Sequence, residues 1–146
     1  MLFGASSLPY YARSRQMEAA QMAAASRQQA LWKAALASSN RLDTAQRAYK
    51  NGDIVVAARL YASVARSRPK TAMTEKAKNC LGLLAQEARE KIDGIDATLI
   101  EQSREISPSE RLMPERWPEN WQDTVATAFD EYDRIVRDYR AVPAVK

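Results

Sequence analysis

Histidine is absent from this chain of 146 residues, and cysteine occurs once, as Cys80. Without histidine, the chain cannot build a Ser-His or Cys-His nucleophile pair or a histidine metal site. A single cysteine permits neither an intrachain disulfide nor a zinc site made of cysteines. Because Cys80 falls on an apolar helical stripe, we interpret it as a core thiol. We therefore expect no catalytic activity, no cofactor and no bound metal.

Glycine-rich phosphate loops are missing as well. Carboxylates do cluster, at residues 87–96 and 130–133, but basic residues interleave them in the first run. A solvated helix face explains such runs. An enzyme that works with carboxylates stays as an alternative hypothesis.

Glycine, with four residues, and long apolar runs are also scarce. Few glycines argue against a loop-rich β protein and against a flexible low-complexity chain. No segment reaches the roughly 18 apolar residues that a membrane-spanning helix needs, so we expect no transmembrane segment in this chain. Hydrophobic residues make up 46% of the sequence and charged residues 27%, as is ordinary for a globular protein.

The sequence is dominated instead by a hydrophobic period of about 3.6 residues, with no convincing strand alternation. This period predicts an all-α fold of antiparallel helical hairpins or a bundle, repeat-like in the middle and without a β-sheet. The expected helices cover residues 12–36, 42–49, 54–68, about 71–99 and 118–139, with a single turn at 107–110. The first is rich in alanine, so its apolar face should pack tightly or not at all.

Local signals set the expected helix ends. The Ser-Ser-Asn run at residues 38–40 is expected to end the first helix and to cap the second. The Asn-Gly pair at 51–52 suits a helix C-terminus because both residues tolerate the left-handed conformation, and Asp53 is expected to cap the next helix. Gly94 predicts a kink or a break in the long helix.

We expect a flexible tail at residues 1–11, a single helical domain over 12–141 and a C-terminal tail at 142–146. The sequence is compatible with more than one cellular compartment. A lone cysteine fits a reducing compartment such as the cytoplasm. The acid-poor start with its two arginines partly resembles an organelle transit peptide, and a removed N-terminal anchor is a further alternative.

Charge is spread unevenly over a net charge of +4. Residues 1–50 hold seven basic residues against two acids, whereas residues 101–146 hold seven against ten. This division favours electrostatic partners or contact between the two ends of the chain. An ordinary solvated surface is the alternative interpretation.

A tight helical hairpin is indicated around residues 49–69. There, a Gly-Asp pair separates two helical patterns, and small, aromatic and small apolar residues follow at helical spacing before a proline. The residues that form this pattern, with a Leu-Gly pair downstream, are Gly52, Asp53, Ala57, Tyr61, Val64, Pro69, Leu81 and Gly82. Over about residues 41–85 the pattern resembles a tetratricopeptide repeat, which implies helices packed through Ala57 and Tyr61. A plain antiparallel bundle with one tight hairpin is the alternative.

Two side-chain groups are candidate binding sites. A basic group surrounds the turn before the long helix and consists of Arg66, Arg68, Lys70, Lys76 and Lys78. It can engage phosphates, anionic lipid or an acidic partner, although cations at a helix C-terminus also explain it. The second group is aromatic, with Trp117 and Trp121 as candidate partner contacts beside Phe129, Tyr132 and Tyr139. These side chains either close the core or stay partly exposed for a partner.

Taken together, the missing catalytic motifs and the repeat-like hairpin predict a noncatalytic protein–protein interaction or scaffold module that binds a protein or a second copy of itself. The alternative is an electrostatic binder of nucleic acid or an anionic surface, acting through the basic N-terminal half.

Overall fold

The protein is all-α, as the hydrophobic period predicts. The computed structural model describes residues 8–143, and every regular element in that range is a helix. The helices are α1 Leu8–Lys50, α2 Ile54–Arg66, α3 Ala72–Ser103, α4 Pro108–Arg111, the short 3-10 helix η1 Pro114–Arg116 and α5 Glu119–Asp138. Within that range no helix is both long and apolar enough to cross a bilayer.

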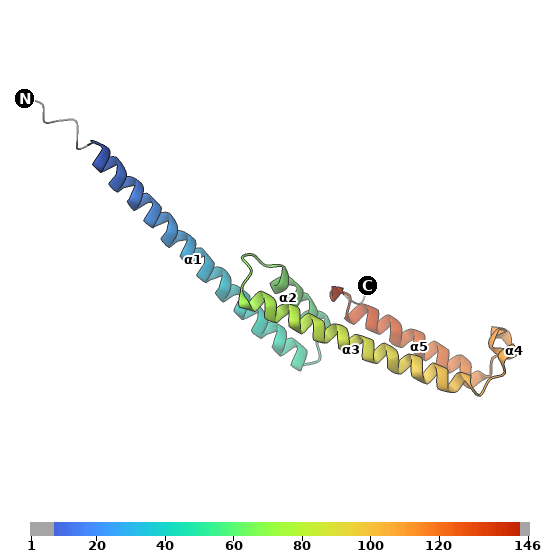
Figure 1. Cartoon of the computed structure of the whole chain (residues 1–146). Helices are drawn as coiled ribbons and strands as arrows, with labels where there is room; N and C mark the ends of the chain where they lie inside the picture. Colours follow the sequence, from blue (N-terminus) through green and yellow to red (C-terminus); the bar gives the residue numbers. More distant parts are fainter. Residues whose placement is uncertain (1–7, 144–146) are drawn as a thin grey trace, which may run out of the picture.

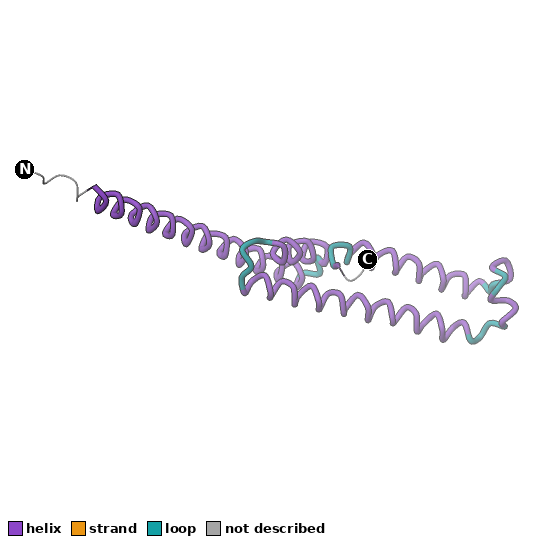
Figure 2. The backbone as a smooth tube through the Cα atoms, turned by 45° about the horizontal axis from the view of Figure 1, so that its top comes forward, coloured by secondary structure: helices purple, strands orange, loops and turns teal. Residues whose placement is uncertain are grey.

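The molecule is elongated, and its helices form two overlapping hairpins (Figures 1 and 2). The C-terminal part of α1 packs against α2, and α2 packs against the start of α3. The far half of α3 pairs with α5, which runs back toward α2. The first half of α1 extends alone from this body, so the two ends of α1 have different surroundings (Figure 1).

Helix α1 is continuous through residues 38–40, so the predicted break there is wrong. None of these residues is glycine or proline, and each costs only about half a kcal/mol in a helix. Ser38 is buried, with its hydroxyl 3.5 Å from that of Ser67. The Thr44 hydroxyl donates to the Asn40 carbonyl at 2.9 Å. Packing against the α2–α3 connection therefore outweighs the capping preference of these polar residues.

The predicted tails also differ from the structure. Helix α1 begins at Leu8, so residues 8–11 are helical, while residues 1–7 of the expected tail lie outside the described residues. At the other end, Val142 is only 1% exposed and belongs to the core, not to a C-terminal tail. Its amide donates to the Tyr139 carbonyl at 2.8 Å, which turns the chain back onto the body.

The turn between α1 and α2 depends on Gly52, whose φ of 84° lies in the left-handed region that side chains with a Cβ disfavour. The amides of Gly52 and Asp53 then donate to carbonyls in the last turn of α1. This is the predicted glycine C-cap. Asp53 stands at the N-cap of α2, but its side chain makes no capping hydrogen bond, contrary to the expectation.

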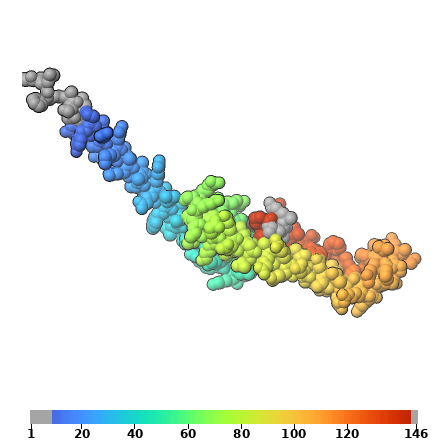
Figure 3. Space-filling view, in the orientation of Figure 1, coloured from blue at the N-terminus to red at the C-terminus, as the bar shows by residue number. Residues whose placement is uncertain are grey.

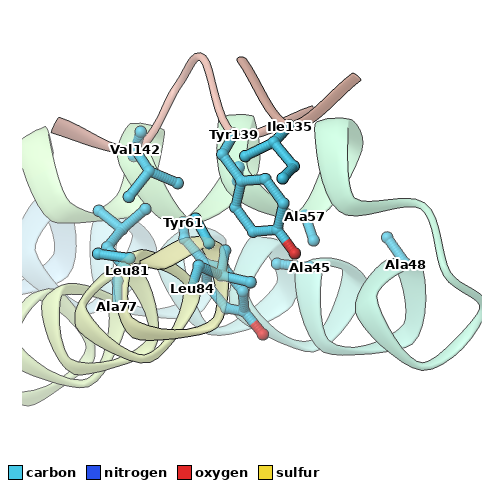
Figure 4. Packing of buried hydrophobic residues seen from close by; sticks show 14 of the residues in the cluster. Ala45, Ala48, Ala57, Tyr61, Ala77, Leu81, Leu84, Ile135, Tyr139 and Val142 are labelled. Carbon is cyan, nitrogen blue, oxygen red and sulfur yellow. The ribbon is translucent and has the colours of Figure 1, made fainter. Parts of the chain in front are cut away.

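Small side chains form the contact between α1 and α2. Ala45 on α1 and Ala57 on α2 are both fully buried and lie next to each other in Figure 4. Nine of the nineteen buried hydrophobic residues in the described range are alanines. Tyr61, Leu81 and Leu84 supply much of the remaining volume beside them (Figure 4). The packing between these helices therefore comes from the close approach of their backbones and not from bulky side chains.

Helix α3 joins the two hairpins without a break at Gly94. The Thr98 hydroxyl donates to the Gly94 carbonyl at 3.0 Å within the helix. After α3, the predicted capping box forms, with the Ser107 hydroxyl accepting from the Glu110 amide at 3.4 Å and the Ser107 amide donating to the Glu110 carboxylate at 3.3 Å. This box starts the single turn α4 where the sequence predicts it.

Replacing Ala57 with leucine should overpack the α1–α2 contact and lower the free energy of unfolding by about 1–3 kcal/mol. The neighbouring Val56→Leu is the control because Val56 is 47% exposed, and it should change stability by less than about 0.5 kcal/mol. Urea unfolding of both variants measures the difference. Equal midpoints would mean that the two helices do not pack through Ala57.

Candidate functional site

The N-terminal part of α1 that extends from the body carries an exposed apolar surface. Between residues 9 and 33 every side chain is exposed except that of Ser14, which is half-buried. The large apolar residues on this half are Tyr10, Tyr11, Met17, Met22, Leu31, Trp32 and Leu36. We call residues 9–37 the projecting segment; Figure 3 shows it as a rod with no other element against its visible face.

One face of the projecting segment continues the face that packs inside the protein. Residues seven apart in a helix fall on nearly the same side. The seven-residue series on α1 runs Tyr10, Met17, Ala24, Leu31, Ser38, Ala45. Ser38 and Ala45 are buried in the body of the protein, whereas the four earlier members are exposed. A face suited to helix packing thus extends about six turns beyond the helices that cover it, and it turns gradually because each seven-residue step falls about 20° short of two full turns.

The projecting segment is also basic. It holds Arg13, Arg15, Arg27 and Lys33 against the single acid Glu18. None of these takes part in the three ion pairs found between residues 8 and 143. The segment therefore offers unpaired positive charge beside its apolar side chains.

The predicted basic group lies on the loop between α2 and α3 and on the first turns of α3, with all five side chains exposed. Arg66, in the last turn of α2, fits the explanation by the helix dipole. Lys76 and Lys78 do not, because they lie near the N-terminus of α3, where the dipole opposes a cation. Lys78 instead pairs with Glu75 at 2.8 Å.

The predicted tryptophans pack in the connection between α3 and α5. Both Trp117 and Trp121 are half-buried, with ring centroids 6.2 Å apart and planes at 76°. The indole N–H of Trp117 donates to the Arg111 carbonyl at 3.2 Å, which ties it to α4. The aromatic ring that lies open on this part of the chain is that of Phe129, which is 65% exposed.

A second apolar surface lies on one side of the α3–α5 pair, and of its residues the sequence singled out only Phe129, as one of the aromatic side chains that either close the core or stay partly exposed. Ile100, Phe129 and Val136 are each more than half exposed. Tyr132 lies between the last two along α5 and donates its hydroxyl to Asp96, one helical turn before Ile100. This hydrogen bond raises the pKa of Tyr132 to about 12. Because Ile100 lies about one turn from Asp96, and Phe129 and Val136 lie about one turn to either side of Tyr132, we infer that these three apolar residues share one side of the pair, and we call them the hairpin face.

The exposure of this surface has a simple cause in the sequence. Phe129 adjoins the buried Ala128, and Val136 adjoins the buried Ile135. A helical stripe that includes both members of each pair is too wide for one packing partner. The width of that apolar stripe is the feature of the sequence that indicates that some of its residues stay exposed.

Another side of the α3–α5 pair holds an open groove of about 670 Å³. Its charged lining is mixed, with Lys91 and Arg134 facing Asp123, Glu131 and Asp138. Among the described residues, no group of three or more potential metal ligands lies together. The lining of the groove therefore favours no particular class of ligand.

A polar cluster ties three helices together near the middle of the molecule. The Glu87 carboxylate accepts hydrogen bonds from Tyr139 at 2.7 Å and from Tyr49, at the end of α1, at 3.1 Å. Lys91 approaches the same carboxylate at 3.2 Å and donates to the Tyr139 hydroxyl at 2.9 Å. Burial opposes the charge on Glu87, but these hydrogen bonds outweigh it and hold its pKa below the ordinary value.

The three partners of Glu87, which are Tyr49, Lys91 and Tyr139, all have a raised pKa. The hydrogen bond with Tyr139 raises the pKa of Lys91, and Glu87 adds to the effect. Burial is the main cause that raises the pKa of Tyr139. The cluster stays charged at neutral pH and acts as a structural link, since it joins the ends of α1 and α5 to α3.

Replacing Glu87 with glutamine should lower the free energy of unfolding by about 1 kcal/mol at pH 7, because charged hydrogen bonds at a partly exposed site are lost. The pKa of Glu87 is lowered in the folded protein, so its contribution is full above the ordinary carboxyl value of 4.5 and disappears as the pH falls through the lower folded value. Urea unfolding at pH 7 and near pH 3 measures this change.

Glu90→Gln is the matched control for that measurement. Glu90 bonds only within α3, accepting from Gln86 at 2.9 Å, and should show a smaller effect. Equal losses for the two variants, or a Glu87→Gln effect that is the same at both pH values, would contradict the role of Glu87.

Comparison of the chain with protein-family models, curated proteins and solved structures finds no match. The resemblance to a tetratricopeptide repeat therefore stays a prediction. Of the residues that suggested it, Ala57, Tyr61, Val64 and Leu81 are buried. Pro69 lies in the α2–α3 loop, and Gly82 is exposed with nothing within 4 Å of a Cβ placed there.

Proposed function

We propose that this protein is a noncatalytic protein–protein interaction module whose binding surface is the projecting segment of α1. The observation that supports this proposal is the exposure of seven large apolar side chains on the part of α1 that extends beyond the other helices. Helices in proteins gain most of their stability from packing of an apolar face. Exposed apolar surface of this extent is typical of binding sites.

The charge of the projecting segment supports a partner with acidic character. Four basic residues against one acid, all exposed, give the segment a positive field along most of its length. Complementary charge speeds association and selects among partners, while the apolar side chains supply most of the affinity. A helix laid against a partner's apolar groove or helix pair is the binding mode that fits this composition.

Placing a photo-crosslinking amino acid at Leu31 should capture a protein partner, because Leu31 lies on the exposed part of the seven-residue series. The control position is Arg59, which is exposed on α2 outside the proposed surface. A second substitution, Met17→Glu, should lower the adduct yield at position 31 by about tenfold if it removes one main contact. Mass spectrometry of the adducts measures both. No adduct at position 31, or equal yields at 31 and 59, would overturn the proposed binding surface.

The second candidate function is electrostatic binding of nucleic acid. The observation that favours it is the group of five exposed cations around the α2–α3 loop, of which only Lys78 takes part in an ion pair found between residues 8 and 143. The four exposed cations of this group that form no ion pair favour an anionic ligand near the α2–α3 loop.

Reversing Arg66, Arg68 and Lys70 to glutamate should abolish binding to duplex DNA if this second candidate is correct. Binding by the unaltered chain should also fall steeply between about 50 and 200 mM salt as counterions are released. Arg134→Glu with Arg137→Glu, on α5, is the control and should retain binding. Fluorescence anisotropy measures the affinities, and binding that survives the first reversal would exclude this function.

A further inference from the structure

The chain carries two uncovered apolar surfaces that cannot meet within one molecule. The projecting segment leaves the body in one direction, and the α3–α5 pair extends in the other (Figures 1 and 3). Helix α1 is unbroken from Leu8 to Lys50, so the projecting segment cannot fold back onto the hairpin face of its own chain. If these surfaces meet, they do so between two molecules.

The two surfaces carry opposite charge. The projecting segment has four basic residues and one acid. Helix α5 has six acids against two arginines, and residues 90–103 of α3 have four acids against one lysine. Three of the α5 acids line the groove on the other side of the pair, which leaves Glu119, Asp130 and Asp133 for this contact. Opposed charges of this kind favour contact between the basic segment of one molecule and the acidic α3–α5 pair of another.

The projecting segment is also shaped for packing on helices. Met17 and Leu31 belong to the seven-residue series whose later members, Ser38 and Ala45, already pack inside the body of the protein. The exposed contact would extend the established one along the same face of α1. The hairpin face offers Ile100, Phe129 and Val136 as apolar counterparts, drawn from two helices that lie side by side (Figure 2).

Pairing of two projecting segments with each other is less favourable. Arg13 stands one turn before Met17, and Arg27 one turn before Leu31. Packing this face against its own copy would bring arginines of both chains to one interface without acids to pair them. The acidic α3–α5 pair does not impose that repulsion.

We propose that the projecting segment of one chain packs on the hairpin face of a second copy of the chain. This inference rests on the proposed function, since it names the partner of the same α1 surface. Reciprocal exchange of the two segments closes the assembly as a pair, with two equal contacts. Bringing Arg27 and Lys33 beside the acids of α5 makes the association weaken as salt rises.

Size-exclusion chromatography with light scattering on the full chain tests the proposal. At low salt the mass should rise with concentration from the 16.4 kDa of one chain toward twice that value. The double variant Met17→Glu with Leu31→Glu should shift the dissociation constant by about tenfold or more. Its control, Ser26→Glu with Gln29→Glu, adds the same charge on another side of α1 and should associate more tightly than the first variant. A chain that stays monomeric at all concentrations, or two variants with equal affinities, overturns the proposal.

A mixing experiment distinguishes this contact from pairing of two α1 helices. Phe129→Glu with Val136→Glu removes the hairpin face but leaves α1 intact. Each double variant should be monomeric alone, whereas their mixture should associate, because one intact segment meets one intact face. If the Phe129 and Val136 variant still pairs by itself, or if the mixture stays monomeric, the proposed contact is wrong. Far-ultraviolet circular dichroism of each variant should match that of the unaltered chain, since all four replaced residues are at least 50% exposed.

The outcomes for the two proposals can be told apart. A monomeric chain that still forms an adduct with a different protein at position 31 contradicts association with a second copy and leaves the interaction function standing. A chain that neither associates nor forms any adduct contradicts both. An adduct between position 31 of one chain and α5 of another supports both.

Discussion

Close contact between alanines of α1 and α2 is the constraint on which the rest of the structure depends. Ala45, Ala57 and Ala58 are completely buried, so the two helices approach without bulky side chains between them. Such a contact has little apolar area per residue, and its stability comes from the number of atoms in close range. It also fixes the turn at Gly52, whose positive φ brings the helices together at once. The direction of α2, and through it the position of α3, follows from this contact.

The small core explains why the C-terminal residues matter to the body of the protein. Tyr139 and Val142 are almost fully buried and add volume that the alanines lack. The hydroxyl of Tyr139 reaches Glu87 on α3, which also binds Tyr49 from the end of α1. One carboxylate thus connects residues that are far apart in the sequence. The end of the chain closes the core and anchors α5 to α3, so the uncovered side of that pair is held in a defined position.

The sequence predicted the all-α fold, the Gly52 turn, the capping box at Ser107 and the main helices, because each depends on local period or turn chemistry. It did not predict the unbroken α1. Local rules placed a cap at residues 38–40, but burial of Ser38 against the α2–α3 connection is a long-range contact that no local pattern contains. For the same reason, the local pattern favoured the tryptophans as candidate contacts. Whether Trp117 or Phe129 is covered depends on how the chain turns between α3 and α5, and the structure covers the tryptophan.

The length and alanine content of α1 have a consequence for binding. Alanine has the highest intrinsic helix propensity, so a segment rich in alanine keeps much of its helical form without a partner. The segment is further helped by its continuity with the packed half of α1, because a helix extends from an existing turn more easily than it starts. Binding therefore does not require the chain to order a disordered tail, and less conformational entropy is lost on association. The seven large apolar side chains are therefore already arranged along a helix before the proposed partner binds. The contact between α1 and α2 thus supports the proposed binding surface, since it holds the end from which that helix extends.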